Sequence, residues 1–229
     1  MNTTLIMQFL RDIAENNNRT WFQLHHDEYL AAKEEFERHI PMVIGRIAEF
    51  DPSVAHLTVR DVTYRFYRDT RFSPDKSPYK RHLGAYIAAH GKKSLHGGYY
   101  FHLEPGQCML ACGTYYLPTN ILTACRNEIM GNIQEWLSCV DNPAFLNYFG
   151  TPGSHEGKGF GLEHLKTCPS GFPRDYQHIE YLRMKDYCCW HNVSDDFFSS
   201  DTWINDMADV FQVGKPMIDF INAVVDDYE

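Results

Sequence analysis

The chain has 229 residues with a formal net charge of -9, and 44% of its residues are hydrophobic while 22% are charged. This composition is typical of a globular protein long enough to bury a core. The negative net charge argues against a protein that coats nucleic acid or an anionic membrane, because both would repel it.

The N-terminal residues predict two helices. Apolar residues recur at helical spacing after Thr3 and Thr4, which can cap the helix, and the pattern should end near Glu15. Three asparagines follow, and asparagine favours the end of a helix because it tolerates left-handed backbone. Thr20 can then cap a second, longer helix, which Pro41 is expected to kink or divide.

Farther along the chain the apolar residues alternate with other residues, which is the period of a strand. The alternation predicts about five strands, around residues 62–68, 82–89, 98–104, 107–116 and 184–191. Their short connections, among them a hairpin turn at Pro105-Gly106, favour antiparallel pairing.

Helical spacing returns after Pro118, with Gly131 as a candidate break. We interpret the rest as irregular over residues 141–171, weakly helical over 174–182, and as two helices over 201–211 and 215–227. With no linker or repeat, residues 1–229 are expected to form a single α+β domain, in which helices pack on a mainly antiparallel sheet of about five strands.

The cysteines and the N-terminus both indicate a cytoplasmic protein. Seven cysteines, an odd number scattered through the chain, are typical of reduced thiols rather than a disulfide framework. No apolar run approaches the roughly 20 residues of a membrane span. The first residues lack the basic start of a signal peptide, so none is expected.

The most unusual stretch is residues 60–86, RDVTYRFYRDTRFSPDKSPYKRHLGAY, called here the basic segment. Seven Arg and Lys residues against three Asp give it a local charge of +4 in a chain of net charge -9. Aromatic residues lie between the cations, and Pro74 and Pro78 brace a turn. Arginine clusters beside aromatic rings are typical of sites that bind carboxylate or phosphate. We therefore predict a pocket for a small anionic ligand, phosphorylated ligands included.

The candidate ligand-binding residues of this segment are Arg65, Arg68, Arg71, Lys76, Tyr79 and Lys80. We expect the first three to direct their guanidinium groups to one point, with Asp69 orienting one of them and Tyr79 closing a lid. Asp69 and His82 are the candidate catalytic residues, as a general acid and base. The other interpretation of His82, which we favour, is an additional hydrogen-bond donor to the same anion. The segment as a whole could also be a solvated surface of Arg–Asp pairs.

Residues 63–87, TYRFYRDTRFSPDKSPYKRHLGAYI, resemble the signature of an uncharacterised family catalogued as domain of unknown function 2461. Residues 16–22, NNNRTWF, are similar to an Asn-Asn-x-Arg-x-Trp-Phe element of that family. Further positions that look like family positions are Arg126, residues 169–172, Leu182, Arg183 and Lys185. The resemblance implies one α+β domain and no particular reaction, and it adds Arg19 and Arg126 to the candidate ligand-binding residues. We expect Asn17, Arg19 and Trp21 to pack near the basic segment.

We expect no metal and no cofactor. The chain has no C-x2-C pair, and residues 153–161 lack the pattern of a phosphate-binding P-loop. Three functions stay open: a binder of, or enzyme for, a small anionic ligand, a protein-interaction module that docks an acidic partner segment, and a local nucleic-acid binder. A concave site would support the first, a flat patch the second, and a groove with aligned aromatic rings the third. We favour the first and consider nucleic acid unlikely.

Overall fold

The structure is a computed structural model that describes residues 1–228. Within them, five strands form one antiparallel sheet in the order β1-β2-β3-β5-β4. The strands are β1 (Leu83–Ile87), β2 (Gly98–Leu103), β3 (Met109–Thr114), β4 (Lys158–Phe160) and β5 (Tyr187–Asn192). The predicted α+β fold with a mainly antiparallel sheet is therefore confirmed.

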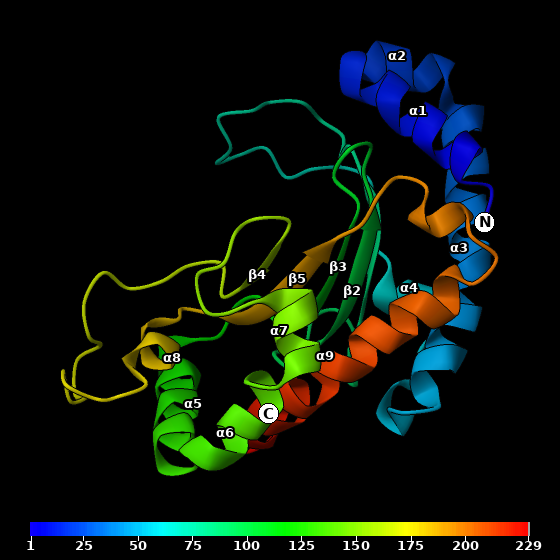
Figure 1. Cartoon of the computed structure of the whole chain (residues 1–229). Coiled ribbons are helices and arrows are strands. Elements are labelled where there is room, and N and C mark those ends of the chain that lie inside the picture. Colours follow the sequence, from blue (N-terminus) through cyan, green and yellow to red (C-terminus); the bar gives the residue numbers. More distant parts are fainter. Residues whose placement is uncertain (229) are drawn as a thin grey trace.

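Helices cover one face of this sheet, and long loops lie on the other side (Figure 1). The α-helices are α1 (Thr3–Glu15), α2 (Arg19–Leu24), α3 (His26–Ala48), α4 (Val59–Val62), α5 (Thr119–Gly131), α6 (Ile133–Val140), α7 (Pro143–Phe149), α8 (Ile179–Arg183) and α9 (Trp203–Val225). Two short 3-10 helices, η1 (Pro52–Val54) and η2 (Phe197–Ser199), complete the helical elements of residues 1–228. None of these helices has both the length and the hydrophobicity to span a membrane.

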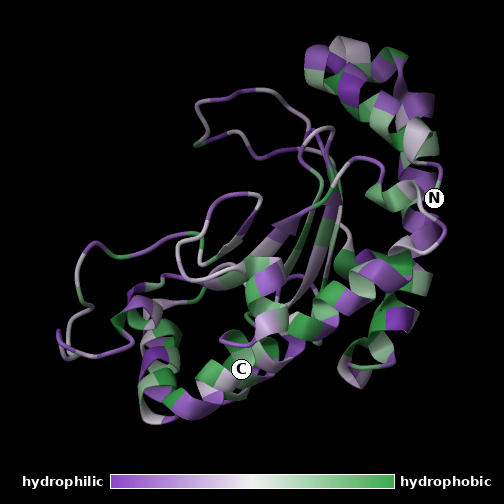
Figure 2. Cartoon of the chain, viewed as in Figure 1, coloured by the Kyte–Doolittle hydropathy of each residue, from purple (hydrophilic) through white to green (hydrophobic). Residues whose placement is uncertain are grey.

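The core lies between the sheet and the helices α3 and α9. Phe101 of β2 packs on Phe36 of α3, with ring centres 5.5 Å apart, and Tyr99 packs on Phe211 of α9 at 5.4 Å. Figure 2 shows hydrophobic residues gathered on the helices and strands, whereas the long loops are mostly hydrophilic. Because successive strand residues point to opposite faces, the residues between these core positions face the loops. We call the side of the sheet covered by α3 and α9 the helix face, and the opposite side, which faces the long loops, the cleft face.

Asparagines begin the two N-terminal helices. The side chains of Asn2 and Asn18 accept hydrogen bonds from backbone amides three residues later, at 3.2 Å and 2.9 Å. The predicted caps Thr3, Thr4 and Thr20 are wrong, since all three lie inside helices. The predicted end of the first helix at Glu15 is confirmed.

Proline does not divide the long helices. Pro41 lies within α3, and Pro216 lies within α9, so the two predicted C-terminal helices are one helix. Twelve residues of α9 are buried, and this packing outweighs the hydrogen bond that proline cannot make. Gly131 does end α5, as expected, and α6 follows after one residue.

The predicted strand at residues 62–68 is wrong. Val62 ends the short helix α4, and the rest of this stretch makes only the isolated bridges Thr63 to Ala85 and Tyr67 to Tyr79. Two backbone hydrogen bonds join it to residues 78–80, where the chain runs back beside it: Lys80 N donates to Phe66 O, and Arg68 N donates to Pro78 O. The fifth strand is β4 instead, which together with α7 falls in the stretch interpreted as irregular.

Candidate functional site

The cleft face of the sheet is the floor of a cleft of about 790 Å³. Its floor consists of alternate strand residues: Tyr86, Gly98, Tyr100, His102, Met109, Ala111, Gly113, Cys188 and Trp190. Its walls include Tyr64, Lys80 and His82 of the basic segment, the loop 92–95, Tyr115, Tyr116 and Leu162. Clefts of roughly 300–1,000 Å³ are typical of small-molecule sites. This cleft is concave and mostly apolar, several aromatic rings line it, and lysines lie at its edge.

Three glycines of the sheet lie where neighbouring atoms leave no space for a side chain. Gly98 and Gly113 are register partners on β2 and β3, and a Cβ atom would lie 2.4 Å from the carbonyl oxygen of Ile87 at the first and 2.0 Å from that of Tyr187 at the second. Gly84 lies opposite His102, and a Cβ atom there would come 2.7 Å from the hydroxyl oxygen of Tyr100. The phenol of Tyr100 thus occupies the space that a side chain at position 84 would need.

Two histidines and a glutamate gather at the end of the cleft nearest the basic segment. The rings of His82 and His102 stack with centres 5.2 Å apart. His82 Nδ1 lies 3.7 Å from Glu104 Oε2. The two residues are neighbours because Leu83 and Leu103 are register partners in an antiparallel pair, with His82 before the first and Glu104 after the second. His102 Nε2 is 2.7 Å from the carbonyl oxygen of Gln107, and its Nδ1 is 3.1 Å from the Tyr100 hydroxyl.

Burial controls the charge of this cluster. It lowers the pKa of His82 to about 4, and the nearby positive charges of His102 and Lys80 add to the shift. Burial also lowers the pKa of His102. The pKa of Lys80 is lowered by burial and then by the charge of Arg65, while its ammonium lies 4.8 Å from the centre of the Tyr64 ring. Both histidines are therefore neutral near pH 7.

We expect His82 to titrate near pH 4 in an NMR pH titration of its ring protons. The unfolded value is about 6.5, so the unfolded chain binds more protons between the two values. The stability that neutral His82 provides is complete above pH 6.5 and is lost as the pH falls towards 4. The same chain in urea supplies the reference, and a folded-state midpoint at or above the urea value would contradict the expectation.

Comparisons with known proteins place the chain in a family. Residues 5–220 match the family model described as conserved hypothetical protein, DUF2461. The chain belongs to this family. Searches of curated proteins and of solved structures found no match. The resemblance carried by the basic segment is therefore confirmed.

The structure of this DUF2461 protein separates the three arginines that we expected to converge. Arg68 Nη1 lies 2.6 Å from Asp75 Oδ2 and 2.7 Å from Ser77 Oγ, inside the loop 67–79, called here the basic loop. Arg71 instead pairs with Asp69 at 2.7 Å. The prediction of one convergence point is wrong, because carboxylates within the same loop bind two of the three guanidinium groups.

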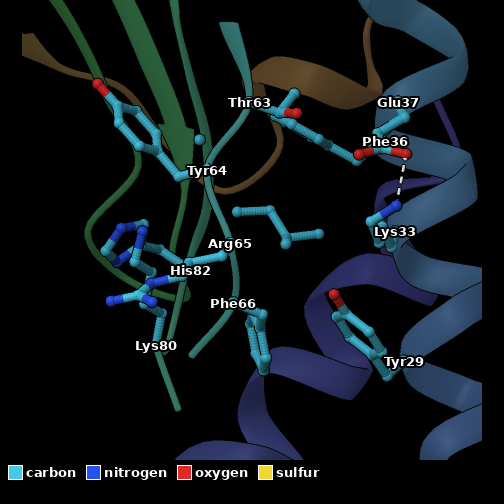
Figure 3. A pocket seen from close by; sticks show the side chains of 12 residues that line it. Tyr29, Lys33, Phe36, Glu37, Thr63, Tyr64, Arg65, Phe66, Lys80 and His82 are labelled. Carbon is cyan, nitrogen blue, oxygen red and sulfur yellow. Dashed lines mark hydrogen bonds and ion pairs between the residues drawn. The ribbon is translucent and has the colours of Figure 1, made fainter. Parts of the chain in front are cut away.

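Arg65, Lys80 and His82 do lie together. They line a small cavity of about 20 Å³ beside the main cleft, which is room for about one water molecule. Figure 3 shows the three side chains on the side of the segment away from α3. Lys80 and His82 also line the main cleft, so these two of the predicted site residues connect the basic segment to it.

Tyr79 is not a lid in this structure. It is 2% exposed, its ring stacks on Phe22 with centres 4.0 Å apart, and its backbone N and O both bond to the side chain of Asn17 at 3.0 Å. The prediction that Asn17 packs near the basic segment is confirmed. Trp21 reaches the segment indirectly. Its ring centre lies 6.4 Å from that of Phe9, which in turn lies 5.7 Å from that of Phe66 in the segment.

The other predicted site residues lie in three different places. Asp69 is bonded to Arg71, which lowers the pKa of its carboxyl to about 2, and the carboxylate nearest His82 is Glu104 instead. Exposed Arg19 lies close enough to Tyr79 that its charge opposes the rise in the tyrosine pKa that burial causes. Lys76 Nζ donates to the carbonyl of Thr70 at 3.0 Å.

Arg126 lies apart from the basic segment. It is 6% exposed in α5 and donates to the carbonyl oxygen of Met184 at 2.9 Å. This contact connects α5 to the chain between α8 and β5, so the structure gives Arg126 a structural contact. No group of three metal-ligating side chains lies together in the described residues.

Sequence reasoning did not single out Tyr100, His102 and Trp190. A signal was present in the sequence. Tyr100 and His102 alternate with the buried residues of β2, and Trp190 follows the buried Cys189 in β5. An aromatic or histidine residue repeated at such positions indicates a second face that is not simply solvated. Their proximity to Lys80 and His82 depends on the strand register, which the sequence does not state.

Proposed function

We propose that the cleft binds a small anionic ligand with a planar, partly apolar body. The observation that carries this proposal is the combination of a concave, mostly apolar floor that includes aromatic rings with lysines at its edge. Tyr100 and Trp190 offer ring surface, and Gly98 and Gly113 line the cleft with peptide backbone, on which a flat group can lie. Aromatic surface with a few polar groups around it is the usual composition of a small-molecule site.

Lys80 supports an anionic ligand more directly than the arginines do. Arg68 and Arg71 already bond to carboxylates of their own loop, whereas the Lys80 ammonium faces the ring of Tyr64 inside the cleft. Lys92 and Lys93 line the cleft as well. An anionic group near Lys80 would also restore the ordinary pKa of that lysine, which burial and Arg65 now lower.

The test is a thermal-shift screen of phosphate, sulfate, nucleotides and dicarboxylates on the wild type, Lys80→Met and Lys76→Met. A ligand at 100 times its Kd stabilises the folded state by about 2.7 kcal/mol. That raises Tm by about 5–10 °C in a protein of this size. We expect Lys80→Met to weaken binding about tenfold, which is the loss of about 1.4 kcal/mol.

Lys76→Met is the matched control, because Lys76 has the same charge but bonds back to its own loop. It should bind like the wild type. The proposal is wrong if no anion shifts the wild type, or if both lysine variants lose binding equally.

One observation favours a second function, a protein-interaction module. Phe72 is 93% exposed in the basic loop, next to Arg71, and the loop projects from the sheet (Figure 1). An exposed aromatic ring among cations can dock an acidic segment of a partner. Binding of a labelled poly-glutamate peptide that Phe72→Ala weakens, without an anion effect in the cleft, would favour this function instead.

A further inference from the structure

The hydrogen bonds at one end of the cleft have a single direction. The carbonyl oxygen of Gln107 only accepts, so His102 Nε2, 2.7 Å away, carries a hydrogen. Burial lowers the pKa of His102, so the ring is neutral near pH 7 and its Nδ1 has a free lone pair. The Tyr100 hydroxyl, 3.1 Å from Nδ1, must therefore donate its hydrogen to His102.

This direction determines what Tyr100 offers to the cleft. Its only hydrogen is committed to His102, while the lone pairs of its oxygen are free to accept. Tyr100 lines the cleft together with Lys80. A ligand held near Lys80 can thus place an O–H group against the Tyr100 oxygen.

We propose that Tyr100 and His102 form a proton relay that removes a proton from an O–H acid bound in the cleft. The relay rests on the proposed ligand-binding function of the same cleft. The ligand classes that fit are phenols and enols acidified by an electron-withdrawing group, because only these approach the acidity of an imidazolium. Planar phenols and enols also suit the aromatic floor.

The proton transfers balance without any co-reactant. The ligand O–H bond breaks, its electron pair stays on the ligand oxygen, and the proton goes to the Tyr100 oxygen. In the same concerted step the Tyr100 O–H bond breaks and its proton goes to Nδ1 of His102, so the tyrosine oxygen never carries two protons. The products are a ligand oxyanion, a neutral tyrosine and an imidazolium whose Nε2–H still bonds to Gln107.

Neighbouring charges favour both products. The ammonium of Lys80 lies in the same cleft as the new oxyanion. Burial lowers the pKa of His102 overall, and the bond to the Gln107 carbonyl and the charge of Glu104 oppose that shift, so both of them stabilise the imidazolium. His82 is neutral near pH 7 and so does not oppose a charge on the ring stacked against it.

The absence of a side chain at Gly84 determines where the Tyr100 hydroxyl lies. Position 84 has no side chain, and the Tyr100 hydroxyl fills the space beside it, where a Cβ atom would lie 2.7 Å away. Gly84 therefore acts as a positioning residue, which keeps the hydroxyl at His102. This contact supplies a second variant that disturbs the relay without removing either of its members.

The experiment uses two probes on the full chain. 4-Nitrophenyl phosphate has no phenolic proton and tests binding alone, by its competition with 4-nitrophenol and by the thermal shift that it causes. 4-Nitrophenol has one, and the visible absorption of its phenolate reports ionisation. With the protein in saturating excess, we expect the pH midpoint of bound 4-nitrophenol to fall by about one unit, a tenfold change in its ionisation constant. Nitrogen NMR of His102 should then show both ring nitrogens protonated.

Tyr100→Phe should remove both the shift and the NMR change, and Gly84→Ala should reduce them, with folding checked by circular dichroism. If 4-nitrophenyl phosphate does not bind the wild type, the ligand-binding function fails and the relay with it. If that probe binds but the pH midpoint of bound 4-nitrophenol does not change, the relay alone is wrong. The same conclusion follows if the full shift remains in folded Tyr100→Phe or in folded Gly84→Ala. Loss of folding in Tyr100→Phe leaves the decision to Gly84→Ala and the His102 spectrum.

Discussion

Replacing Gly113 with alanine is expected to destabilise the protein by about 3 to 5 kcal/mol. Gly113 has φ +100°, which L-residues rarely adopt, and a Cβ atom there would lie 2.0 Å from the carbonyl oxygen of Tyr187 on β5. Backbone strain of about 1–3 kcal/mol and steric overlap of similar size both apply. Chemical denaturation should show the loss directly, and Tm should fall by about 10 °C.

Gly106→Ala is the matched control. Gly106 has φ +73° in the turn between β2 and β3, but nothing lies within 4 Å of an added Cβ atom. It therefore keeps the strain and lacks the overlap, so its cost should be only about 1–2 kcal/mol. Equal losses in the two variants would show that the close approach of β3 and β5 at Gly113 is not rigid.

The floor of the cleft depends on this close approach. The Tyr86 hydroxyl donates to the carbonyl oxygen of Gly113 at 2.9 Å or to that of His96 at 2.8 Å, which connects three neighbouring chain segments at one point. A Cβ atom at position 113 would also lie 2.9 Å from Cε of Met217 on α9, so the added methyl group would press on the helix face of the sheet.

Four of the five strands could be predicted from the sequence, because alternation over five or six residues reports a strand that buries one face. The three residues of β4 are too few to show a period, and one of them is Gly159, over which Trp190 packs. The stretch 62–68 shows the opposite error, because its residues alternate like those of a strand and yet form none. Val62 and Phe66 are buried, and Tyr64 turns to the cleft, without the continuous hydrogen-bond ladder of a strand. Alternation in this stretch therefore predicted neither the side that Tyr64 faces nor the partner with which the stretch pairs.

The candidate site could be predicted only in part, for a similar reason. The charge count found the basic segment, and Lys80 and His82 do line the cleft. The count could not assign partners, and Asp75 neutralises Arg68, one of the arginines that we expected to bind the ligand. Tyr100 and His102 reach the site through the register of β1 and β2, which is a property of the folded sheet.

The N-terminal helices anchor the basic segment, and Phe22 is the centre of that anchor. Phe22 is 2% exposed, its ring stacks on Tyr79 at 4.0 Å, and the rings of Tyr29 and Phe66 lie 5.1 Å and 5.9 Å away. The backbone bonds between Tyr79 and Asn17 lie beside this stack. The place of Lys80 in the cleft therefore depends on a residue almost 60 positions earlier in the chain.

Phe22→Ala should destabilise the protein by about 3–5 kcal/mol, because it removes a buried ring and leaves a cavity among aromatic side chains. The control is Phe72→Ala, which removes the same atoms from a ring that is 93% exposed and should change stability by less than about 0.5 kcal/mol. Denaturation midpoints measure the difference. Phe22→Ala should also speed trypsin cleavage at Arg71 and Lys76, since the loop that carries them loses the packing beneath Tyr79. Equal cleavage rates in wild type and Phe22→Ala would show that the bonds to Asn17 hold the basic loop without the ring stack.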